Sequence, residues 1–258
     1  MIDRRALIVG GMSAAALTAA LADERSPPRN QTIELRQYTL FAGKRDRLIE
    51  LFEREFIVPQ NEVGAQVLGA FTDLDDPDRF VWLRGFRNME ARGSALPAFY
   101  NGPVWQRHRD AANETMRDSD NVLLLRLLSG RLEPTSPSDA GAFYSIWIYY
   151  LRRTDSERFA EFFEETMRPA LAASGIDLLA TLATERQPNN YPRLPIREGE
   201  EVFVQVASHR SLAHMQASEE RLRSLSGWRD RAPDDILPTL MRKPEHLRLA
   251  PTFRAASG

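Results

Sequence analysis

Three polar side chains lie two residues apart near the start of the chain, at Glu34, Arg36 and Tyr38 in the stretch IELRQYTL at 33–40. In a β-strand, side chains two residues apart project from the same face. The stretch RFVWLRGF at 79–86 repeats this spacing with an aromatic and a basic residue. An arginine in such a group can hold a carboxylate, an enolate or a quinone oxygen, and a glutamate can pair with it. We refer to these residues as the polar set: Glu34, Arg36, Tyr38, Trp82 and Arg84.

The polar set is predicted to face the interior of the sheet structure. The opposite face carries plain aliphatic side chains such as Ile33 and Leu35, which suit a covering layer of helices. One interpretation is a concave pocket with polar and aromatic lining for a small ligand. The other is a buried network of ion pairs that sets the register of the strands and binds nothing.

Other catalytic chemistry is poorly represented. The 258 residues include no cysteine, which excludes disulfides, zinc–thiolate sites, iron–sulfur clusters and thiol nucleophiles. The histidines are scattered, and His209 and His214 are five residues apart, which is not the i, i+4 spacing of a helical metal pair. There is no Gly-rich phosphate loop and no G-x-S-x-G elbow. We therefore expect no metal and no cofactor, haem included, and the sequence does not decide whether the protein is an enzyme.

The N-terminus has the pattern of an export signal. Arg4 and Arg5 precede a moderately apolar run, and Ala20-Leu21-Ala22 has the A-x-A form of a cleavage site. Residues 1–22 are predicted to be a signal peptide of twin-arginine type, with a general secretory signal as the alternative. The run is too short and too rich in small residues to span a membrane. We expect a periplasmic or secreted protein without a stable membrane anchor after signal removal.

Two copies of one unit account for most of the remaining chain. Each copy is predicted to contain a strand, a helix, two strands, two helices and a last strand. The predicted strands lie at 33–40, 66–74, 79–86 and 121–128, and again at 143–151, 177–185, 201–208 and 245–252. Pro59 and Pro169 mark the predicted ends of the first helix in each copy. The predicted segments are a flexible lead-in at 23–32, a domain at 33–131, a linker at 132–142, a second domain at 143–252 and a tail at 253–258.

This order of elements is that of a ferredoxin-like unit, whose antiparallel sheet carries helices on one face only. Two units in tandem can cover each other's bare face. The predicted fold is therefore α+β, with tandem ferredoxin-like units forming a pseudo-symmetric α/β barrel of the dimeric type and the helices outside. A further homo-oligomer is compatible with this arrangement.

The stretch NGPVWQRHRDAANETMR at 101–117 is predicted to include the helix before the last strand of the first copy. Trp105 recurs as Trp228 at the equivalent point of the second copy, so both are predicted to be structural anchors. His108 has no counterpart, because Trp228 is followed by Arg-Asp-Arg. His108 is a candidate ligand-binding residue, and the alternative is an exposed or locally hydrogen-bonded side chain.

The chain resembles the NIPSNAP family over residues 33–128. The first three members of the polar set match the E-x-R-x-Y opening of NIPSNAP domains, and GPVWQRHRDAANETMRDSDNVLLL at 102–125 is similar to the end of that domain. The resemblance implies the dimeric α/β-barrel fold, shared with small cofactor-free monooxygenases and with haem enzymes, and a poorly defined activity. The second copy departs from the motif, and the residues expected at its three positions are Tyr144, Ile146 and Ile148.

Three functions remain open. The first is an exported NIPSNAP-type barrel that binds a small molecule in a pocket, on the 33–128 side because only that copy carries the polar set. The second is a cofactor-independent monooxygenase or other oxidoreductase acting on an aromatic or quinol-like substrate. The third is a protein-interaction module without a pocket. The net charge of -2 argues against a nucleic-acid partner.

Overall fold

The structure is a computed structural model, and it describes residues 30–136, 139, 141–225 and 237–252. The predicted signal peptide at 1–22, residues 23–29 of the lead-in, the tail at 253–258 and Trp228 lie outside the described residues.

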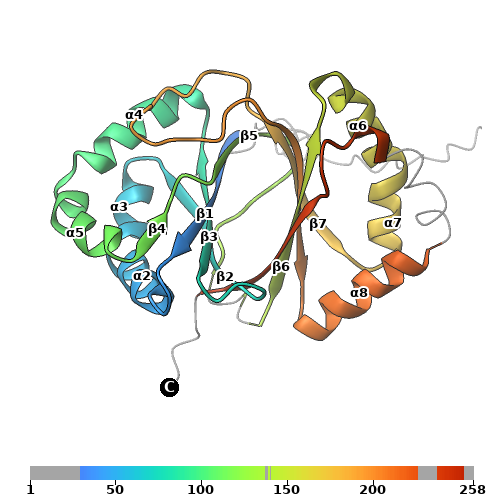
Figure 1. Cartoon of the computed structure of the whole chain (residues 1–258), viewed down its shortest axis with the longest axis horizontal. Helices are drawn as coiled ribbons and strands as arrows, with labels where there is room; N and C mark the ends of the chain where they lie inside the picture. The colour runs from blue at the N-terminus through green and yellow to red at the C-terminus, as the bar shows by residue number, and fades with distance from the viewer. Residues whose placement is uncertain (1–29, 137–138, 140, 226–236, 253–258) are drawn as a thin grey trace, which may run out of the picture.

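A closed barrel of antiparallel strands forms the centre of the molecule (Figure 1). The strand order is β3–β2–β9–β6–β8–β7–β5–β1, and pairing of β3 with β1 closes the ring. A short extra strand, β4, pairs with the end of β1. The strands are β1 Thr32–Leu40, β2 Gln66–Asp73, β3 Arg79–Phe86, β4 Met116–Asp118, β5 Val122–Gly130, β6 Phe143–Leu151, β7 Asp177–Thr184, β8 Glu201–His209 and β9 Glu245–Pro251.

Each half of the chain contributes four neighbouring strands to the barrel. The order within the first half is β2–β3–β1–β5, and within the second half it is β9–β6–β8–β7. Two edge pairings, β2 with β9 and β5 with β7, join the halves. The predicted fold of two ferredoxin-like units in one pseudo-symmetric barrel is confirmed, and closure leaves the eight barrel strands without an unpaired edge.

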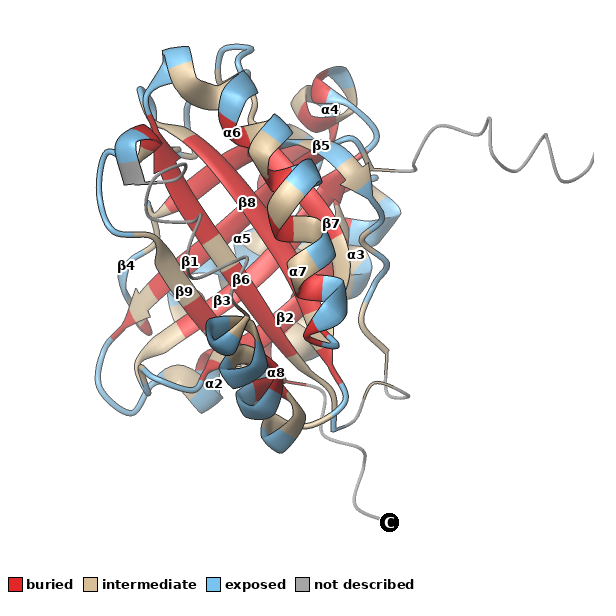
Figure 2. Cartoon of the chain, turned by 90° about the vertical axis from the view of Figure 1, so that its right-hand side faces the viewer, coloured by how far each residue is buried: buried red, intermediate tan, exposed pale blue. Residues whose placement is uncertain are grey.

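Helices cover the outside of the barrel in two separate layers (Figures 1 and 2). The helices that begin after β3 and β8 each have a polar cap: Asn88 and Ser211 accept hydrogen bonds from backbone N–H groups of the first turn. The first layer contains α2 Arg45–Leu51, α3 Ile57–Glu62, α4 Met89–Tyr100 and α5 Pro103–Asn113. The second layer contains α6 Ser156–Phe162, α7 Arg168–Ala173 and α8 Leu212–Ser224.

The first long helix of each half contains a π turn, at Phe52–Phe56 and at Phe163–Met167. Pro59 and Pro169 do not end these helices, contrary to the prediction, because α3 and α7 continue beyond them. A proline removes one N–H donor and its ring crowds the preceding turn. The wider π turn just before each proline shifts the hydrogen-bond register of the helix. The helix can therefore continue beyond the proline ring.

The two faces of the strands pack against different partners. The barrel lumen is filled by apolar side chains from both halves, including Ile33, Leu83, Ile146 and Val204. Separate apolar clusters lie beneath each helical layer. The central strands β6 and β8 are buried along most of their length and appear mostly red beneath α6, α7 and α8 in Figure 2, whereas β9 is largely of intermediate burial.

Candidate functional site

The polar set lies between the strands and the helices of the first half, and not in the barrel lumen. Tyr38 and Trp82 belong to the cluster beneath the helices, whereas Leu35 and Val81 belong to the lumen cluster. The five residues do share one face, as predicted, but the predicted face is wrong. The lumen is enclosed by apolar side chains of both halves, so a charge there would lack partners, whereas the helices and a loop supply them on the outside.

The observed strand faces also change the correspondence between the two copies by one residue. β1 and β6 each have nine residues, and their first residues correspond. The residues predicted at the motif positions of the second copy, Tyr144, Ile146 and Ile148, point into the lumen. The residues that occupy those positions are Ser145, Trp147 and Tyr149. The second half therefore keeps the tyrosine but replaces the glutamate and the arginine of the motif.

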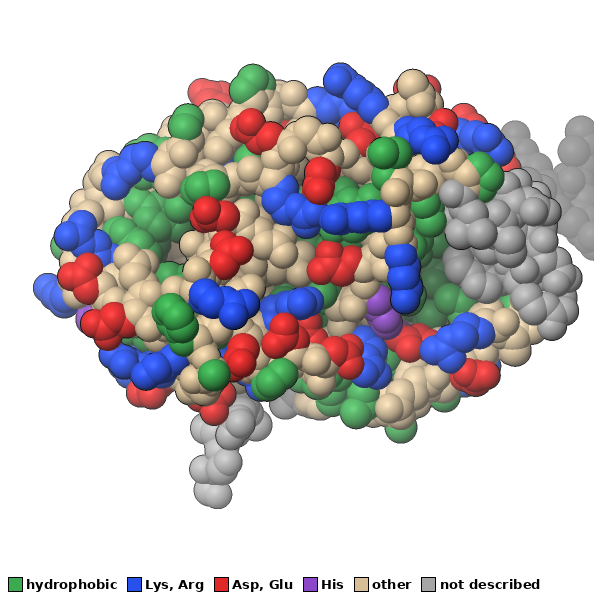
Figure 3. Space-filling model, in the orientation of Figure 1, with side chains coloured by type: hydrophobic (Ala, Val, Ile, Leu, Met, Phe, Trp, Pro, Cys, Tyr) green, Lys and Arg blue, Asp and Glu red, His purple; other side chains and the backbone are tan. Residues whose placement is uncertain are grey.

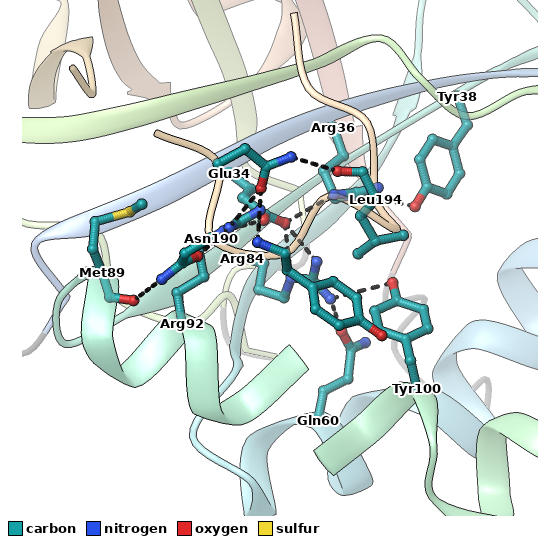
Figure 4. Close-up of polar contacts among 12 residues, drawn as sticks. Glu34, Arg36, Tyr38, Gln60, Arg84, Met89, Arg92, Tyr100, Asn190 and Leu194 are labelled. Carbon is teal, nitrogen blue, oxygen red and sulfur yellow. Dashed lines mark hydrogen bonds and ion pairs between the residues drawn. The ribbon is translucent and has the colours of Figure 1, made fainter. Parts of the chain in front are cut away.

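Glu34 is the centre of the site (Figure 4). Its Oε2 accepts hydrogen bonds from Nη1 of Arg36 at 2.9 Å and from Nε and Nη2 of Arg84 at 3.0 and 2.5 Å. Its Oε1 accepts a hydrogen bond from Nε of Arg92 at 2.7 Å. The exposed fractions of these four residues are 0% or 1%, so the whole cluster is removed from solvent.

Three guanidinium groups share this one carboxylate, which leaves two positive charges without a counter-charge. Among the described residues, no other carboxylate is ion-paired with these arginines. Burial alone would raise the pKa of Glu34, but the charges of Arg84, Arg36 and Arg92 outweigh it and hold that pKa well below its usual range. Burial lowers the pKa of Arg92, although Glu34 opposes this effect. A buried excess of positive charge favours a bound anion.

Neutral polar groups hold two of the arginines in place. Nη1 of Arg84 donates to Oε1 of Gln60 at 2.8 Å and lies 3.5 Å from the hydroxyl of Tyr100. Nε of Arg36 donates to the hydroxyl oxygen of Tyr38 at 2.9 Å. Burial raises the pKa of Tyr38, so this hydroxyl keeps its proton. Because its oxygen accepts from Arg36, that proton is free to be donated to another group.

A loop from the second half completes the site. The segment 185–200, between β7 and β8, crosses to the first half and lies beside α4 (Figures 1 and 4). Nη1 of Arg92 donates to Oδ1 of Asn189 at 3.0 Å and to Oδ1 of Asn190 at 2.6 Å. The equivalent connection in the first half is a tight turn, so only the second half can supply such a cover.

A glycine in α4 allows the loop to approach this closely. A Cβ atom at Gly93 would lie 2.7 Å from Nδ2 of Asn190. That nitrogen donates to the backbone oxygen of Met89 at 2.5 Å, so it cannot move away without losing the bond. Next along the loop, the ring of Tyr191 stacks on Tyr100 with 6.0 Å between ring centroids.

A small cavity of about 30 Å³ lies in the aromatic layer beside the cluster. Tyr38, Gln60, Trp82 and Tyr100 contribute its polar lining. The indole Nε1 of Trp82 is buried without a hydrogen-bond partner in the described part of the chain, as is Nη2 of Arg92. Buried donors are nearly always paired, so the indole N–H of Trp82, which is the one of the two that belongs to a residue lining this cavity, indicates a missing acceptor there.

The two other first-half candidates lie on α5, on the far side of this layer. Trp105 packs against Tyr100 and Phe56, with ring centroids 4.9 and 5.5 Å apart, and also lines the small cavity. Nε2 of His108 lies 3.4 Å from Oε2 of Glu55. His108 therefore faces a surface carboxylate and is not joined to the Glu34 cluster.

Six residues of the site were not predicted: Gln60, Arg92, Tyr100, Asn189, Asn190 and Tyr191. Arg92 had a detectable signal, because it falls on the apolar stripe of its helix with Met89, Leu96 and Phe99, where a charge is unusual. The loop residues had none, since composition does not show which half a long connection will cover.

Other kinds of site find no support among residues 30–136, 139, 141–225 and 237–252. Within them, no group of three or more histidine and acidic side chains is placed to hold a metal ion. No described helix has the length and apolar character needed to cross a membrane. Basic and acidic side chains are interspersed on the face seen in Figure 3.

Solved structures with this fold cover both halves of the chain. A proposed monooxygenase from Fusobacterium nucleatum has a TM-score of 0.58 and 10% identity, over 86% of this chain and 92% of that chain. An anthrone oxidase-like protein has a TM-score of 0.57 and 14% identity, over 89% of this chain and 94% of that chain. A second proposed monooxygenase, from Lactobacillus acidophilus, has a TM-score of 0.54 and 12% identity, over 86% of this chain and 94% of that chain. At these identities the likeness shows the fold alone.

At the level of sequence, no curated protein matches the chain. The model of the NIPSNAP family matches residues 33–128, which span the strands β1, β2 and β3, most of β5, and the whole Glu34 cluster. Residues 33–128, in the first half of this dimeric-type α/β barrel, therefore match the NIPSNAP domain.

Proposed function

We propose that this protein binds a small anionic molecule between the strands and helices of its first half. The observation that carries the proposal is the excess positive charge around Glu34, which balances only one of three buried guanidinium groups. The indole N–H of Trp82, which has no hydrogen-bond partner in the described part of the chain, supports it. A carboxylate or enolate oxygen would supply both the missing charge and the missing acceptor. No cofactor is invoked.

The volume of the cavity limits how such a ligand enters. About 30 Å³ is far below the roughly 300–1,000 Å³ of usual small-molecule pockets. An anionic oxygen fits beside Tyr38 and Trp82, but a larger body requires the aromatic layer or the 185–200 loop to move. We therefore propose that the site closes over its ligand and that the anionic group of the ligand lies innermost, beside Tyr38 and Trp82.

Native mass spectrometry of protein purified from its own cell envelope tests the proposal. We expect a bound small acid that is lost in the Arg36→Ala variant, provided that circular dichroism shows the variant to be folded. Arg47→Ala is the matched control, because Arg47 forms an exposed ion pair with Glu114. An apo mass for the wild type, or equal ligand occupancy in Arg36→Ala, would contradict the proposal and favour the interaction module.

A cofactor-independent oxidoreductase is the second candidate, favoured by the shared fold with the anthrone oxidase-like protein. With anthrone, the methylene carbon would lose two hydrogens and gain one oxygen atom from O₂, and the other oxygen atom would leave as water. Arg36 and Tyr38 would stabilise the enolate oxygen that forms when the first proton leaves. This candidate ranks second because a tricyclic ring far exceeds the cavity. Oxygen uptake with anthrone at the rate of a buffer blank would rule it out.

We further propose that the protein is exported and acts in the periplasm or outside the cell. The support is the arginine pair, the apolar run and the A-x-A pattern within residues 1–22.

A further inference from the structure

A second and larger cavity lies at one end of the barrel and shares no lining residue with the Glu34 cluster. Its volume is about 670 Å³, which is within the usual range for small-molecule sites. Side chains that form or pack against the lumen cluster provide an apolar floor: Leu68, Phe71, Leu83, Tyr144, Leu179 and Val206. Apolar surface in contact with water is unfavourable, so this floor favours an apolar molecule or part of a molecule.

The rim of the cavity is charged. It includes three arginines and three acidic residues: Arg131, Arg210, Arg221, Glu133, Asp139 and Asp177. All of them are exposed except Asp139, which is of intermediate burial. The cavity is therefore amphipathic, with its apolar floor inside the barrel and its charged groups towards solvent.

The acidic groups of the rim already have partners. Glu133 is ion-paired with Arg131. The carboxylate of Asp139 accepts hydrogen bonds from the backbone N–H and the hydroxyl of Ser136. The carboxylate of Asp177 accepts one from the hydroxyl of Ser208 at 3.1 Å.

Two arginines of the rim have no acidic partner. Nε and Nη2 of Arg221 donate to the backbone oxygen of Ser174 at 3.0 and 2.8 Å, and Nη2 also donates to the hydroxyl of Ser218 at 2.9 Å. These acceptors are neutral, so they hold the guanidinium group in place without balancing its charge. Among the described residues, neither Arg210 nor Arg221 is ion-paired with a carboxylate.

These two arginines make the side of the rim next to α8 electropositive. Burial lowers the pKa of His214, which also lines the cavity, and Arg210 and Arg221 lower it further. No acidic group in the described part of the chain opposes this shift. A Cβ atom at Gly175 would lie 3.3 Å from Nη2 of Arg221 and 3.8 Å from Nε2 of His214, so both side chains approach that glycine. The formal charges of the rim balance in number, but they are separated in space.

We propose that this cavity binds an amphipathic monocarboxylic acid, such as a medium-chain fatty acid. Its apolar chain lies on the floor beside Phe71 and Leu83, where burial supplies most of the affinity. Its carboxylate lies at the rim beside Arg210 and Arg221 and stays partly in water, so the cost of burying a charge is avoided. A single negative charge suits this rim, because the nearby aspartates would repel a doubly charged phosphate group.

Isothermal titration calorimetry with three probes of equal chain length tests this assignment: decanoate, 1-decanol and decyltrimethylammonium. We expect decanoate to bind, and the uncharged and cationic probes to bind about tenfold more weakly or not at all. No binding of decanoate would overturn the proposal. So would equal affinity of decanoate and either of the other probes, because the arginines would then contribute nothing.

Variants at the rim locate the carboxylate. Arg210→Gln and Arg221→Gln should each weaken decanoate about fivefold and leave 1-decanol unchanged, as expected for a partly exposed ion pair. Arg221→Gln also removes the bonds to Ser174, so Arg210→Gln is the variant with the smaller risk to folding. Arg223→Gln is the matched control, because Arg223 lies on α8 and is ion-paired with Glu220. Unchanged decanoate affinity in both rim variants would overturn the assignment.

Two further variants distinguish this cavity from the site at Glu34. Leu179→Trp should fill the floor and weaken both decanoate and 1-decanol, whereas Arg36→Ala should leave both affinities intact. Circular dichroism checks that each variant is folded. Loss of decanoate binding in a folded Arg36→Ala variant, or unchanged binding in Leu179→Trp, would place the acid elsewhere and contradict the proposal.

Discussion

Glu34 is the residue on which the packing of the first half depends. Replacing it by glutamine keeps the shape but leaves three buried guanidinium groups without a counter-charge. We expect Glu34→Gln to lower the free energy of unfolding by about 3–5 kcal/mol, as for other broken buried ion pairs. Urea denaturation at pH 7 measures this loss.

The matched control is Glu50→Gln, because Glu50 forms an exposed i, i+4 ion pair with Arg54. This change should alter the free energy of unfolding by less than about 1 kcal/mol. A Glu34→Gln variant as stable as the control variant would show that Glu34 does not hold the arginines together.

The dependence on pH follows from the lowered pKa of Glu34 in the folded state. Such a carboxylate stabilises the fold at any pH above its unfolded pKa of about 4.3. The contribution is lost as the pH falls below that value towards the lower folded pKa. The difference between the urea midpoints of wild type and Glu34→Gln should therefore be constant from pH 7 to about pH 5 and become smaller towards pH 3. A constant difference over this range would contradict the assigned pKa shift.

At the scale of elements, the contact between α4 and the 185–200 loop joins the two halves at the site. Gly93 lies within α4, where alanine is normally more stable by about 0.5–1 kcal/mol. In the wild type, Gly93→Ala should bring no such gain, because the added Cβ meets Nδ2 of Asn190. In an Asn190→Ala background, the same change should stabilise the protein by the full amount.

A double-mutant cycle of Gly93→Ala and Asn190→Ala, followed by thermal or urea unfolding, measures this coupling. Equal stabilisation by Gly93→Ala in both backgrounds would mean that the loop does not dock on α4. Hydrogen exchange of amides in the 185–200 loop adds a direct measurement. We expect faster exchange there when Gly93→Ala is introduced into the wild type.

At the scale of the whole molecule, closure of the barrel makes the two halves interdependent. The lumen cluster draws residues from both halves, and two strand pairings connect them. A fragment of residues 30–136 would expose its lumen face and two strand edges to water. We expect this fragment to form a dimer that rebuilds the barrel, or to aggregate. Size-exclusion chromatography with light scattering distinguishes these outcomes, and a folded monomer would contradict the interdependence.

Export is a property of the whole chain that can be tested in the cell. In a strain carrying the full sequence, Arg4→Lys combined with Arg5→Lys should block a twin-arginine route and leave precursor in the cytoplasm. Arg25→Lys, beyond the predicted cleavage site, should have no effect. Mature periplasmic protein from the double variant would point to the general secretory route. Unprocessed cytoplasmic wild-type protein would contradict export.

The sequence by itself determined the order of elements, the tandem repeat and the grouping of the polar set. These follow from local periodicity: side chains two apart share a strand face, and helical stripes repeat every three or four residues. The family resemblance at 33–128 likewise depends on residues close together in the chain. Arg92 shows the limit of such patterns, because its place in an apolar stripe signals burial but names no partner.

Only the tertiary structure decided which face of the strands is the lumen and which residues complete the site. Both faces are buried, so hydrophobicity along β1 does not distinguish them, and the predicted orientation of Glu34 was reversed. The loop residues Asn189 and Asn190 lie nearly a hundred positions from Arg92 in sequence. Closure of the barrel brings them together, because it fixes where the second half lies relative to the first, and no local pattern records that position.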